Sequence, residues 1–123
     1  MEVSADEWYE AIRASPTDVA EIANNTGIKL ENIQKVKDHL FHNEHLLDRY
    51  TDLGEPAVMA RFDSSKAIAR VWERLRTGTF AEADLQLLRH EAAEANRVRA
   101  WGPSYTKAHN AAQKRYPAPD LED

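Results

Sequence analysis

The amino-acid sequence predicts an all-α fold: a compact domain of about five to six helices packed orthogonally, with one long loop at about residues 46–62. Apolar residues recur at helical three- and four-residue intervals, most clearly at Leu30, Ile33, Val36, Leu40 and Phe41. Residues that start and end helices divide the chain into segments of ordinary helix length. No alternation of apolar and polar residues extends beyond a few positions, so a long half-buried strand is not expected.

The first two helices are separated by a serine–proline pair. A short helix is expected over residues 5–14, and Ser15 would cap the next one with Pro16 in its first position. Asp18 suits the first turn, where a negative charge is favourable. Gly27 is expected to end this helix in the left-handed conformation.

A third helix follows over residues 30–42 and leads into the long loop. Within the loop, residues 58–62 could form an extended piece, and a loop of this length in a small domain often has a function. A fourth helix is expected to begin at a cap of Asp63 or Ser64 and to continue to Arg76, with Gly78 ending it.

The segment Asp84 to Val98 is predicted to be the central helix. Before it, Thr79 and Glu82 have the spacing of a capping box, in which each side chain accepts a backbone N–H of the other residue. Residues 101–103, Trp-Gly-Pro, should break the helix, and residues 104–114 form a last one. We therefore expect a single domain over residues 1–116 and a loose acidic tail over residues 117–123.

Composition limits the classes of function. No apolar run approaches the ~18 residues of a membrane span, and the first ten residues hold four acidic and no basic side chains, unlike a signal peptide. The formal net charge is −5, which gives no general attraction to nucleic acid. Residues 61–123 carry 11 basic and 9 acidic side chains, however, so a local basic surface is possible. Cysteine is absent, so any metal site must use histidine and carboxylate ligands.

Histidines and glutamates form the chemically richest set in the chain. Its members are His39, His42, His45, His90, Glu91, Glu94 and His109. His90 and Glu94 are four residues apart and share one face of the central helix, with Glu91 beside it. Imidazole and carboxylate groups suit zinc or manganese, and the same groups can act as general acid and base without a metal. The zinc-peptidase helix motif is not met, because a glutamate stands where the second histidine should be.

Three other interpretations compete with a catalytic one. The histidines and glutamates can simply pair with each other or with nearby arginines. Residues 16–42 resemble a helix-turn-helix, although Glu31 and Asp38 would oppose contact with phosphates. Aromatic residues such as Trp101 and Tyr105 could line a cleft beside the helix break, although core packing is the usual role of such residues.

A set of residues spread over about positions 16–116 carries a resemblance to a known class of protein. It comprises Thr26, Gly27, Ile33, Lys37, His39, Phe41, His45, Arg61, Phe62, Asp63, Ile68, Ala69, Trp72, Arg74, Leu75, Gly78, Leu87, Leu88, His90, Glu91, Glu94, Ala108, His109, Lys114 and Tyr116. Together these residues resemble small modules at the C-termini of bacterial polymorphic toxins and some phage-derived proteins. The resemblance implies a soluble effector domain, often hydrolytic and often paired with an immunity protein. It would act in the cytoplasm or be secreted as part of a larger bacterial protein.

We therefore expect a hydrolase, with a nuclease as first choice, or alternatively a non-enzymatic helical interaction or DNA-binding module. The expected cleft is lined by His39, His45, His90, Glu91, Glu94 and His109. Glu91 or Glu94 would orient or deprotonate His90, with His45 or His109 as the acid or base partner. Arg61 could hold a phosphate of a nucleic-acid substrate, and Tyr105 is a second candidate for substrate binding. A zinc or manganese ion, if one is bound, would be held by His90, Glu94 and His45.

Overall fold

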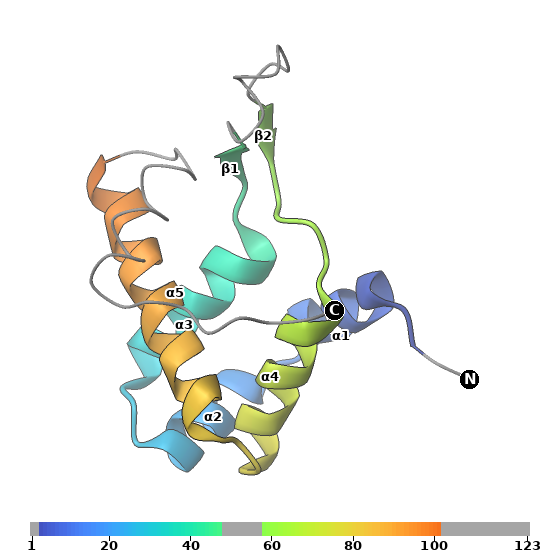
Figure 1. The fold of residues 1–123 in the computed structure, drawn as a ribbon, viewed down its shortest axis with the longest axis vertical. Coiled ribbons are helices and arrows are strands. Elements are labelled where there is room, and N and C mark those ends of the chain that lie inside the picture. Colours follow the sequence, from blue (N-terminus) through green and yellow to red (C-terminus); the bar gives the residue numbers. More distant parts are fainter. Residues whose placement is uncertain (1–2, 48–57, 102–123) are drawn as a thin grey trace.

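A computed structural model of the 123-residue chain describes residues 3–47 and 58–101. The elements in order are α1 (Ala5–Ala14), α2 (Asp18–Thr26), α3 (Leu30–Lys37), the π-helical turn η1 (Asp38–His42), β1 (His45–Leu47), β2 (Val58–Ala60), α4 (Lys66–Thr77) and α5 (Glu82–Trp101). Most of the described chain is helical, which confirms the predicted all-α class (Figure 1). The predicted last helix (residues 104–114) and tail (residues 117–123) lie outside the described residues.

The helices surround a core in which aromatic side chains meet edge to face. Phe41 lies between Tyr9 and Trp72, with ring centroids 4.7 Å and 5.2 Å away. These three residues come from η1, α1 and α4, so one group of edge-to-face aromatic contacts joins elements far apart in the chain. The predicted helical stripe of α3 and η1 also faces this core, because Ile33, Val36, Leu40 and Phe41 are all buried. Leu30, by contrast, remains exposed.

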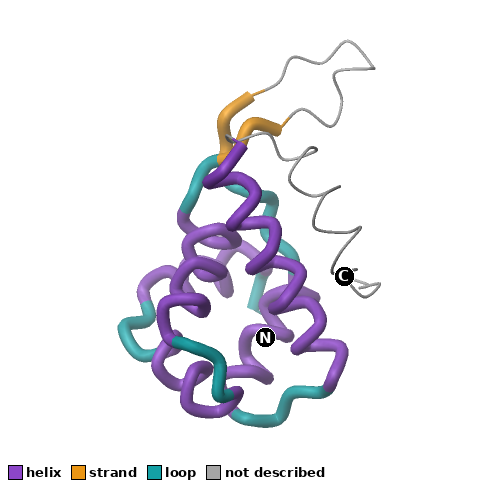
Figure 2. The backbone as a smooth tube through the Cα atoms, turned by 90° about the vertical axis from the view of Figure 1, so that its left-hand side faces the viewer, coloured by secondary structure: helices purple, strands orange, loops and turns teal. Residues whose placement is uncertain are grey.

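Two short strands lie at one end of the helical body (Figure 2). β1 and β2 pair antiparallel, with His45 opposite Ala60 and Leu47 opposite Val58. The predicted extended piece at residues 58–62 is confirmed for Val58–Ala60. The loop prediction is wrong for residues 46–47, which belong to β1. Strands of three residues are too short to produce a detectable alternating pattern.

The start of α2 differs from the prediction. Ser15 does not cap α2; its backbone N–H donates to the Ile12 carbonyl and so closes α1. The N-cap of α2 is Thr17, and the helix begins at Asp18, whose carboxylate accepts the backbone N–H of Val19. A residue before proline is restricted to extended conformations, which suits Ser15 as the end of a helix. The prediction for Gly27 is confirmed, since this residue ends α2 with a φ of 75°.

The caps of α4 and α5 also differ from those predicted. Ser65, rather than Asp63 or Ser64, caps α4 by accepting the backbone N–H of Ile68. The predicted capping box before α5 is wrong, because the backbone N–H of Ala81 donates to Asp84. Asp84 is held there by Arg74, whose guanidinium donates two hydrogen bonds of 2.8 Å to the carboxylate. This tertiary contact decides which carboxylate caps the helix, and local spacing could not reveal it.

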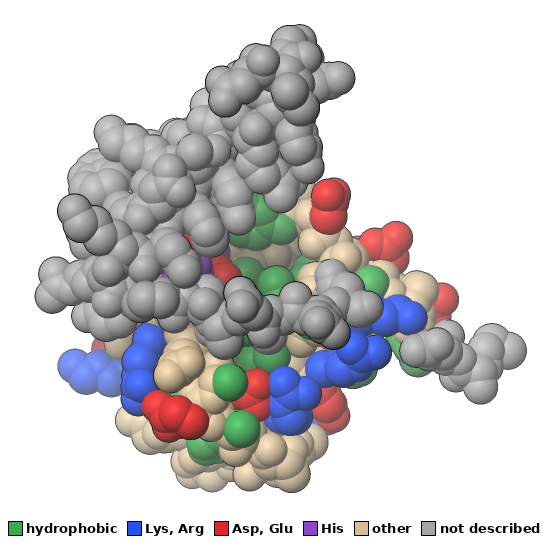
Figure 3. Space-filling view, viewed as in Figure 1, with side chains coloured by type: hydrophobic (Ala, Val, Ile, Leu, Met, Phe, Trp, Pro, Cys, Tyr) green, Lys and Arg blue, Asp and Glu red, His purple; other side chains and the backbone are tan. Residues whose placement is uncertain are grey.

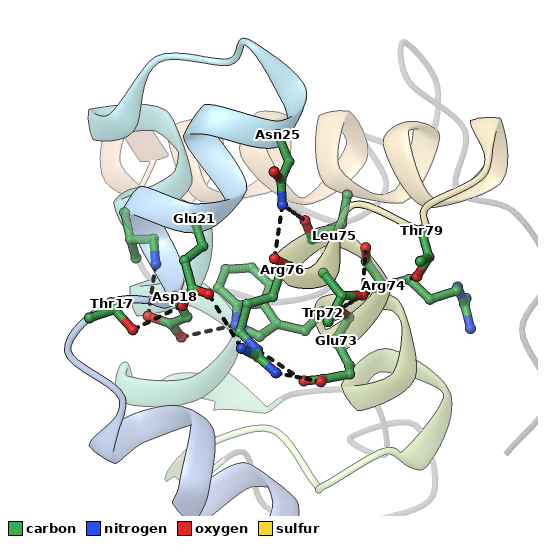
Figure 4. Close-up of polar contacts among 12 residues, drawn as sticks. Thr17, Asp18, Glu21, Asn25, Trp72, Glu73, Arg74, Leu75, Arg76 and Thr79 are labelled. Atoms are coloured by element: carbon green, nitrogen blue, oxygen red, sulfur yellow. Dashed lines mark hydrogen bonds and ion pairs between the residues drawn. The ribbon is translucent and has the colours of Figure 1, made fainter.

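A buried ion pair links three helices. Asp18 and Lys37 are 2% and 4% exposed, and the Lys37 ammonium lies 2.8 Å from the Asp18 carboxylate. The second carboxylate oxygen of Asp18 accepts the indole N–H of Trp72 at 3.0 Å, and Lys37 also donates to the Ser15 carbonyl. Figure 4 shows this contact between α2 and α4. The pair therefore joins α2 to α3, and the indole of Trp72 adds α4, through charged and polar groups that are shielded from solvent.

A second set of polar contacts joins α2 to the end of α4. The Asn25 side-chain amide donates to the carbonyls of Leu75 and Arg76, and Glu21 pairs with Arg76 (Figure 4). The last carbonyls of a helix have no partner within the helix, so Asn25 satisfies two of them. On the outside, basic and acidic side chains are interspersed over the described part of the face in Figure 3, rather than gathered into one basic patch.

Candidate functional site

Five of the chemically interesting side chains meet inside the protein. They are His39 from η1, His45 from β1, and His90, Glu91 and Glu94 from α5; all are between 1 and 8% exposed. We call these five residues the His/Glu cluster. The segments that supply them are far apart in the sequence. The sequence identified these residues as candidates, and the fold brings their side chains into contact. Whether they are catalytic stays a prediction.

The backbone places His39 through an irregular turn. The α-helix of α3 ends at Lys37, and the chain continues as the π-helical turn Asp38–His42. The Asn43 N–H donates to the Asp38 carbonyl at 2.7 Å, five residues back rather than four. A π-turn carries one residue more than the corresponding α-turn, and such turns are frequent at functional sites. Here it directs His39 to the cluster and Phe41 to the core.

Glu94 is the centre of the cluster. One of its carboxylate oxygens lies 3.0 Å from Nε2 of His39, and the other lies 3.2 Å from Nε2 of His90. Glu91 also approaches His39, and its carboxylate lies 3.5 Å from Nε2 of that residue. The arrangement confirms the pairing of His90 with Glu94 expected from their i,i+4 spacing. His39 therefore faces two carboxylates that are themselves neighbours.

His45 is fixed by different contacts. Its Nε2 lies 2.8 Å from the backbone carbonyl of His39, and its ring stacks on Phe62 with centroids 4.2 Å apart and planes 6° apart. The edge of the His39 ring packs against it at 4.6 Å. Phe62 also contacts His39 edge to face at 5.4 Å. Phe62 was part of the resemblance but was not predicted as a site residue, because an aromatic side chain in a loop carries no distinctive signal.

Burial changes the proton affinity of two members of the cluster. The pKa of Glu91 is raised from 4.5 to about 8, first because burial disfavours its charged form and second because the Glu94 charge repels it. The nearby His90 opposes this change in the pKa of Glu91. The pKa of His45 is lowered, chiefly by burial, which disfavours the imidazolium form. Neutral Glu91 and neutral His45 are therefore the favoured forms near neutral pH.

The Glu91→Gln protein is expected to be more stable than the parent at alkaline pH when both are metal-free. A carboxyl with a raised pKa in the folded state makes its stabilising contribution below its unfolded pKa, near 4.5, and loses it as the pH rises through about 8. Each pKa unit corresponds to about 1.4 kcal/mol, so the difference amounts to a few kcal/mol. Urea unfolding in chelator between pH 4.5 and 9 measures it.

The exposed Glu82, replaced by glutamine in the same helix, is the matched control and should leave the pH dependence of unfolding unchanged. Identical pH profiles for Glu91→Gln and the parent would contradict the raised pKa of Glu91.

Three members of the cluster could hold a metal ion. His39, Glu91 and Glu94 each offer one ligand atom, and these atoms lie within 4.8 Å of one another. The set predicted from sequence was His90, Glu94 and His45, so only Glu94 is common to both. One oxygen of Glu94 contacts His39, and the other contacts His90. His90 therefore contacts one of the three possible ligands, Glu94, but is not itself part of the metal-capable group.

The other predicted site residues are not placed in the cluster. Arg61 is exposed, and so is His42, although it lies only three residues from His39. Tyr105 and His109 lie outside the described residues. A groove of about 420 Å³ between α3 and α5 has a lining that includes no member of the cluster: Ile28, Asn32, Ile33, Val36, Leu88, Arg89, Ala92, Ala93 and Asn96. The cluster lies in the interior because its side chains pack on one another and on Phe62.

Over residues 3–47 and 58–101, no helix combines the length and the apolar character needed to cross a bilayer. Comparison with known protein families, with curated proteins and with solved structures found no match.

Proposed function

We propose that this chain is a toxin-like effector domain that hydrolyses its substrate at the His/Glu cluster, with nucleic acid as the first choice of substrate. The observation that carries the proposal is the convergence of three imidazoles and two carboxylates in one buried place. Buried ionisable groups rarely add net stability, because each must be removed from water. Clusters of this kind with perturbed pKa values are characteristic of functional sites.

The cofactor that we propose is one zinc or manganese ion held by His39, Glu91 and Glu94. The donor set fits, since imidazole nitrogen and carboxylate oxygen are ligands that both ions accept, and the three ligand atoms are already close together. An ion there would supply Lewis acidity toward a phosphoryl or carbonyl oxygen and lower the pKa of water. Its positive charge would also offset the negative charges of Glu91 and Glu94, which are buried next to each other.

The remaining residues of the cluster would orient the ligands. His90 donates to the Glu94 oxygen that does not face His39, and so fixes the direction of the carboxylate. Partners of this kind matter for metal affinity, typically by ~10–100-fold. Arg61 is exposed beside Phe62, which itself contacts the cluster, so its guanidinium could receive a substrate phosphate. An immunity protein that blocks the site would be the expected partner.

Expression of the parent chain in a bacterial cell is expected to stop growth, and His90→Ala should restore it. The reason is that removal of His90 leaves Glu94 without one of the two imidazoles that orient it. Colony counts after induction and the integrity of extracted RNA and plasmid DNA provide the measurement. Circular dichroism of the purified variants shows whether the helical fold persists.

His42→Ala is the matched control, because His42 is an exposed histidine three residues from His39 and outside the cluster. It should remain as toxic as the parent. A folded His90→Ala protein with undiminished toxicity would remove the cluster from the mechanism, and a harmless parent chain would remove the effector proposal altogether.

The DNA-binding alternative has less support. Of the two lysines in the last turn of α3, Lys35 and Lys37, the second is buried and bound to Asp18. The acidic Glu31 is exposed at the start of α3, where a recognition helix needs basic or neutral polar groups. A gel shift at two salt concentrations, compared between the parent and Lys35→Ala, distinguishes this alternative from the effector proposal.

A further inference from the structure

His45 differs from the other members of the cluster in having a ring nitrogen without a partner. Its Nδ1 is the buried side-chain nitrogen or oxygen that lacks a hydrogen bond among the residues that the structure describes. Buried polar groups are almost always satisfied, and leaving one unsatisfied costs ~1–3 kcal/mol. An unsatisfied nitrogen next to a candidate metal group therefore requires an explanation of its own.

The contacts of His45 decide what kind of group Nδ1 is. The His39 carbonyl can only accept a hydrogen bond, so the Nε2 that lies 2.8 Å from it must carry the proton. In the neutral ring the second nitrogen then has a lone pair and no hydrogen, which makes Nδ1 an acceptor. Stacking on Phe62 and the edge contact with His39 hold the ring in this orientation.

The acceptor lies close to the metal group without belonging to it. His45 packs against His39, and the charge of Glu94 acts on it, yet its nitrogens are not part of the set of ligand atoms formed by His39, Glu91 and Glu94. A lone pair on a ring that packs against a candidate ligand, His39, suits a small donor bound beside the ion. Water is the smallest such donor, and its second O–H is then free to be donated to another acceptor of the cluster.

We propose that His45 Nδ1 accepts a hydrogen bond from a buried water molecule, and that this water is the nucleophile of the hydrolysis. The second half of this statement rests on the proposed function, whereas the first half does not. By accepting one O–H, His45 directs a lone pair of the water away from its ring and toward the substrate phosphorus. As the water oxygen bonds to phosphorus, a carboxylate of the cluster takes up the proton of the other O–H, and this proton passes to the leaving oxygen when the bond between that oxygen and phosphorus breaks. His45 is in this sense a catalytic residue, and Phe62 is a positioning residue that acts through it.

A crossed pair of substitutions separates this role from a structural one. In His45→Gln the amide nitrogen takes the place of Nε2, so the hydrogen bond to the His39 carbonyl is kept and the Nδ1 acceptor is lost. In His45→Asn the amide oxygen takes the place of Nδ1, so the acceptor is kept and the bond to His39 is lost. We expect kcat for nucleic-acid hydrolysis to fall about 100-fold in His45→Gln and clearly less in His45→Asn.

The opposite order, with His45→Gln active and His45→Asn inactive, would show that His45 merely supports His39 and would overturn the proposal. Zinc stoichiometry is measured on both proteins. His45→Gln should bind zinc as the parent does, and loss of zinc from it would make His45 a ligand instead, which also overturns the proposal.

A high-resolution crystal structure of the parent protein tests the water directly. A water oxygen about 2.7–3.2 Å from Nδ1 supports the proposal, and a dry Nδ1 overturns it while leaving the proposed function standing. If the parent chain hydrolyses nothing, the proposed function and the nucleophile role fall together, and the crystal structure still decides whether the water is bound.

Discussion

Glu94→Gln is expected to lose stoichiometric zinc and manganese binding, with affinity at least about 100-fold below that of the parent. Glu94 is the residue through which the cluster is connected, since its two carboxylate oxygens contact His39 at 3.0 Å and His90 at 3.2 Å. Glutamine keeps the size of the side chain but removes the negative charge and replaces one oxygen with a donor. With one oxygen fewer, the substituted side chain cannot accept hydrogen bonds from both imidazoles through separate oxygens.

Metal content after dialysis, and competition with a chromophoric chelator, measure the loss of binding. Glu82→Gln is the matched control, because Glu82 lies in the same helix with its side chain 69% exposed and should have no influence on the metal. Retention of one tightly bound ion per chain by Glu94→Gln would show that the ion, if any, is held elsewhere. A parent protein that takes up no zinc or manganese would remove the proposed cofactor.

The largest loss of stability is expected from Lys37→Met, at ~3–5 kcal/mol. Methionine keeps the length and apolar stem of the lysine but leaves the Asp18 carboxylate, 2% exposed, without its opposite charge. The Ser15 carbonyl loses its donor at the same time. Urea unfolding at pH 7, with the midpoint and slope recorded for each protein, measures the change in the free energy of unfolding.

The double variant Asp18→Asn/Lys37→Met should regain a large part of this loss, because a neutral amide no longer needs a buried cation. Lys35→Met, in the same helix but outside the ion pair, should change the free energy of unfolding by less than about 0.5 kcal/mol. Equal stability of Lys37→Met and the parent protein would mean that the Asp18–Lys37 pair is not buried as the structure places it.

Local patterns predicted most of the helices correctly, whereas the predicted caps at Ser15 and at Asp63 or Ser64 were wrong. Apolar spacing located α1, α3, α4 and α5. Gly27 and Gly78 were predicted to end α2 and α4, and a left-handed conformation was predicted for Gly27. The errors lie where tertiary contacts override local preference. Asp84 displaces Glu82 as a cap because Arg74 binds it, and two three-residue strands leave no periodic trace.

The candidate site shows the same division. The pairing of His90 with Glu94 follows from helix geometry and was predicted from spacing. Of the three residues predicted as metal ligands, only Glu94 belongs to the metal-capable group, because nothing in the sequence indicates that a π-turn directs His39 at Glu94. Likewise, the packing of Phe62 against His39 and His45 is a property of the folded chain that no local spacing indicates.

The π-turn makes the interior chemistry of this protein depend on the length of its backbone. Deleting a single residue within Asp38–His42 would restore an ordinary α-helical turn and rotate the segment before the deletion by about 100° relative to the segment after it. His39 could then no longer contact Glu94 while Phe41 contacts Tyr9 and Trp72. A chain shortened by one residue here would keep either the buried contacts of Phe41 or the contact of His39 with Glu94. The extra residue is what allows one continuous segment to make both.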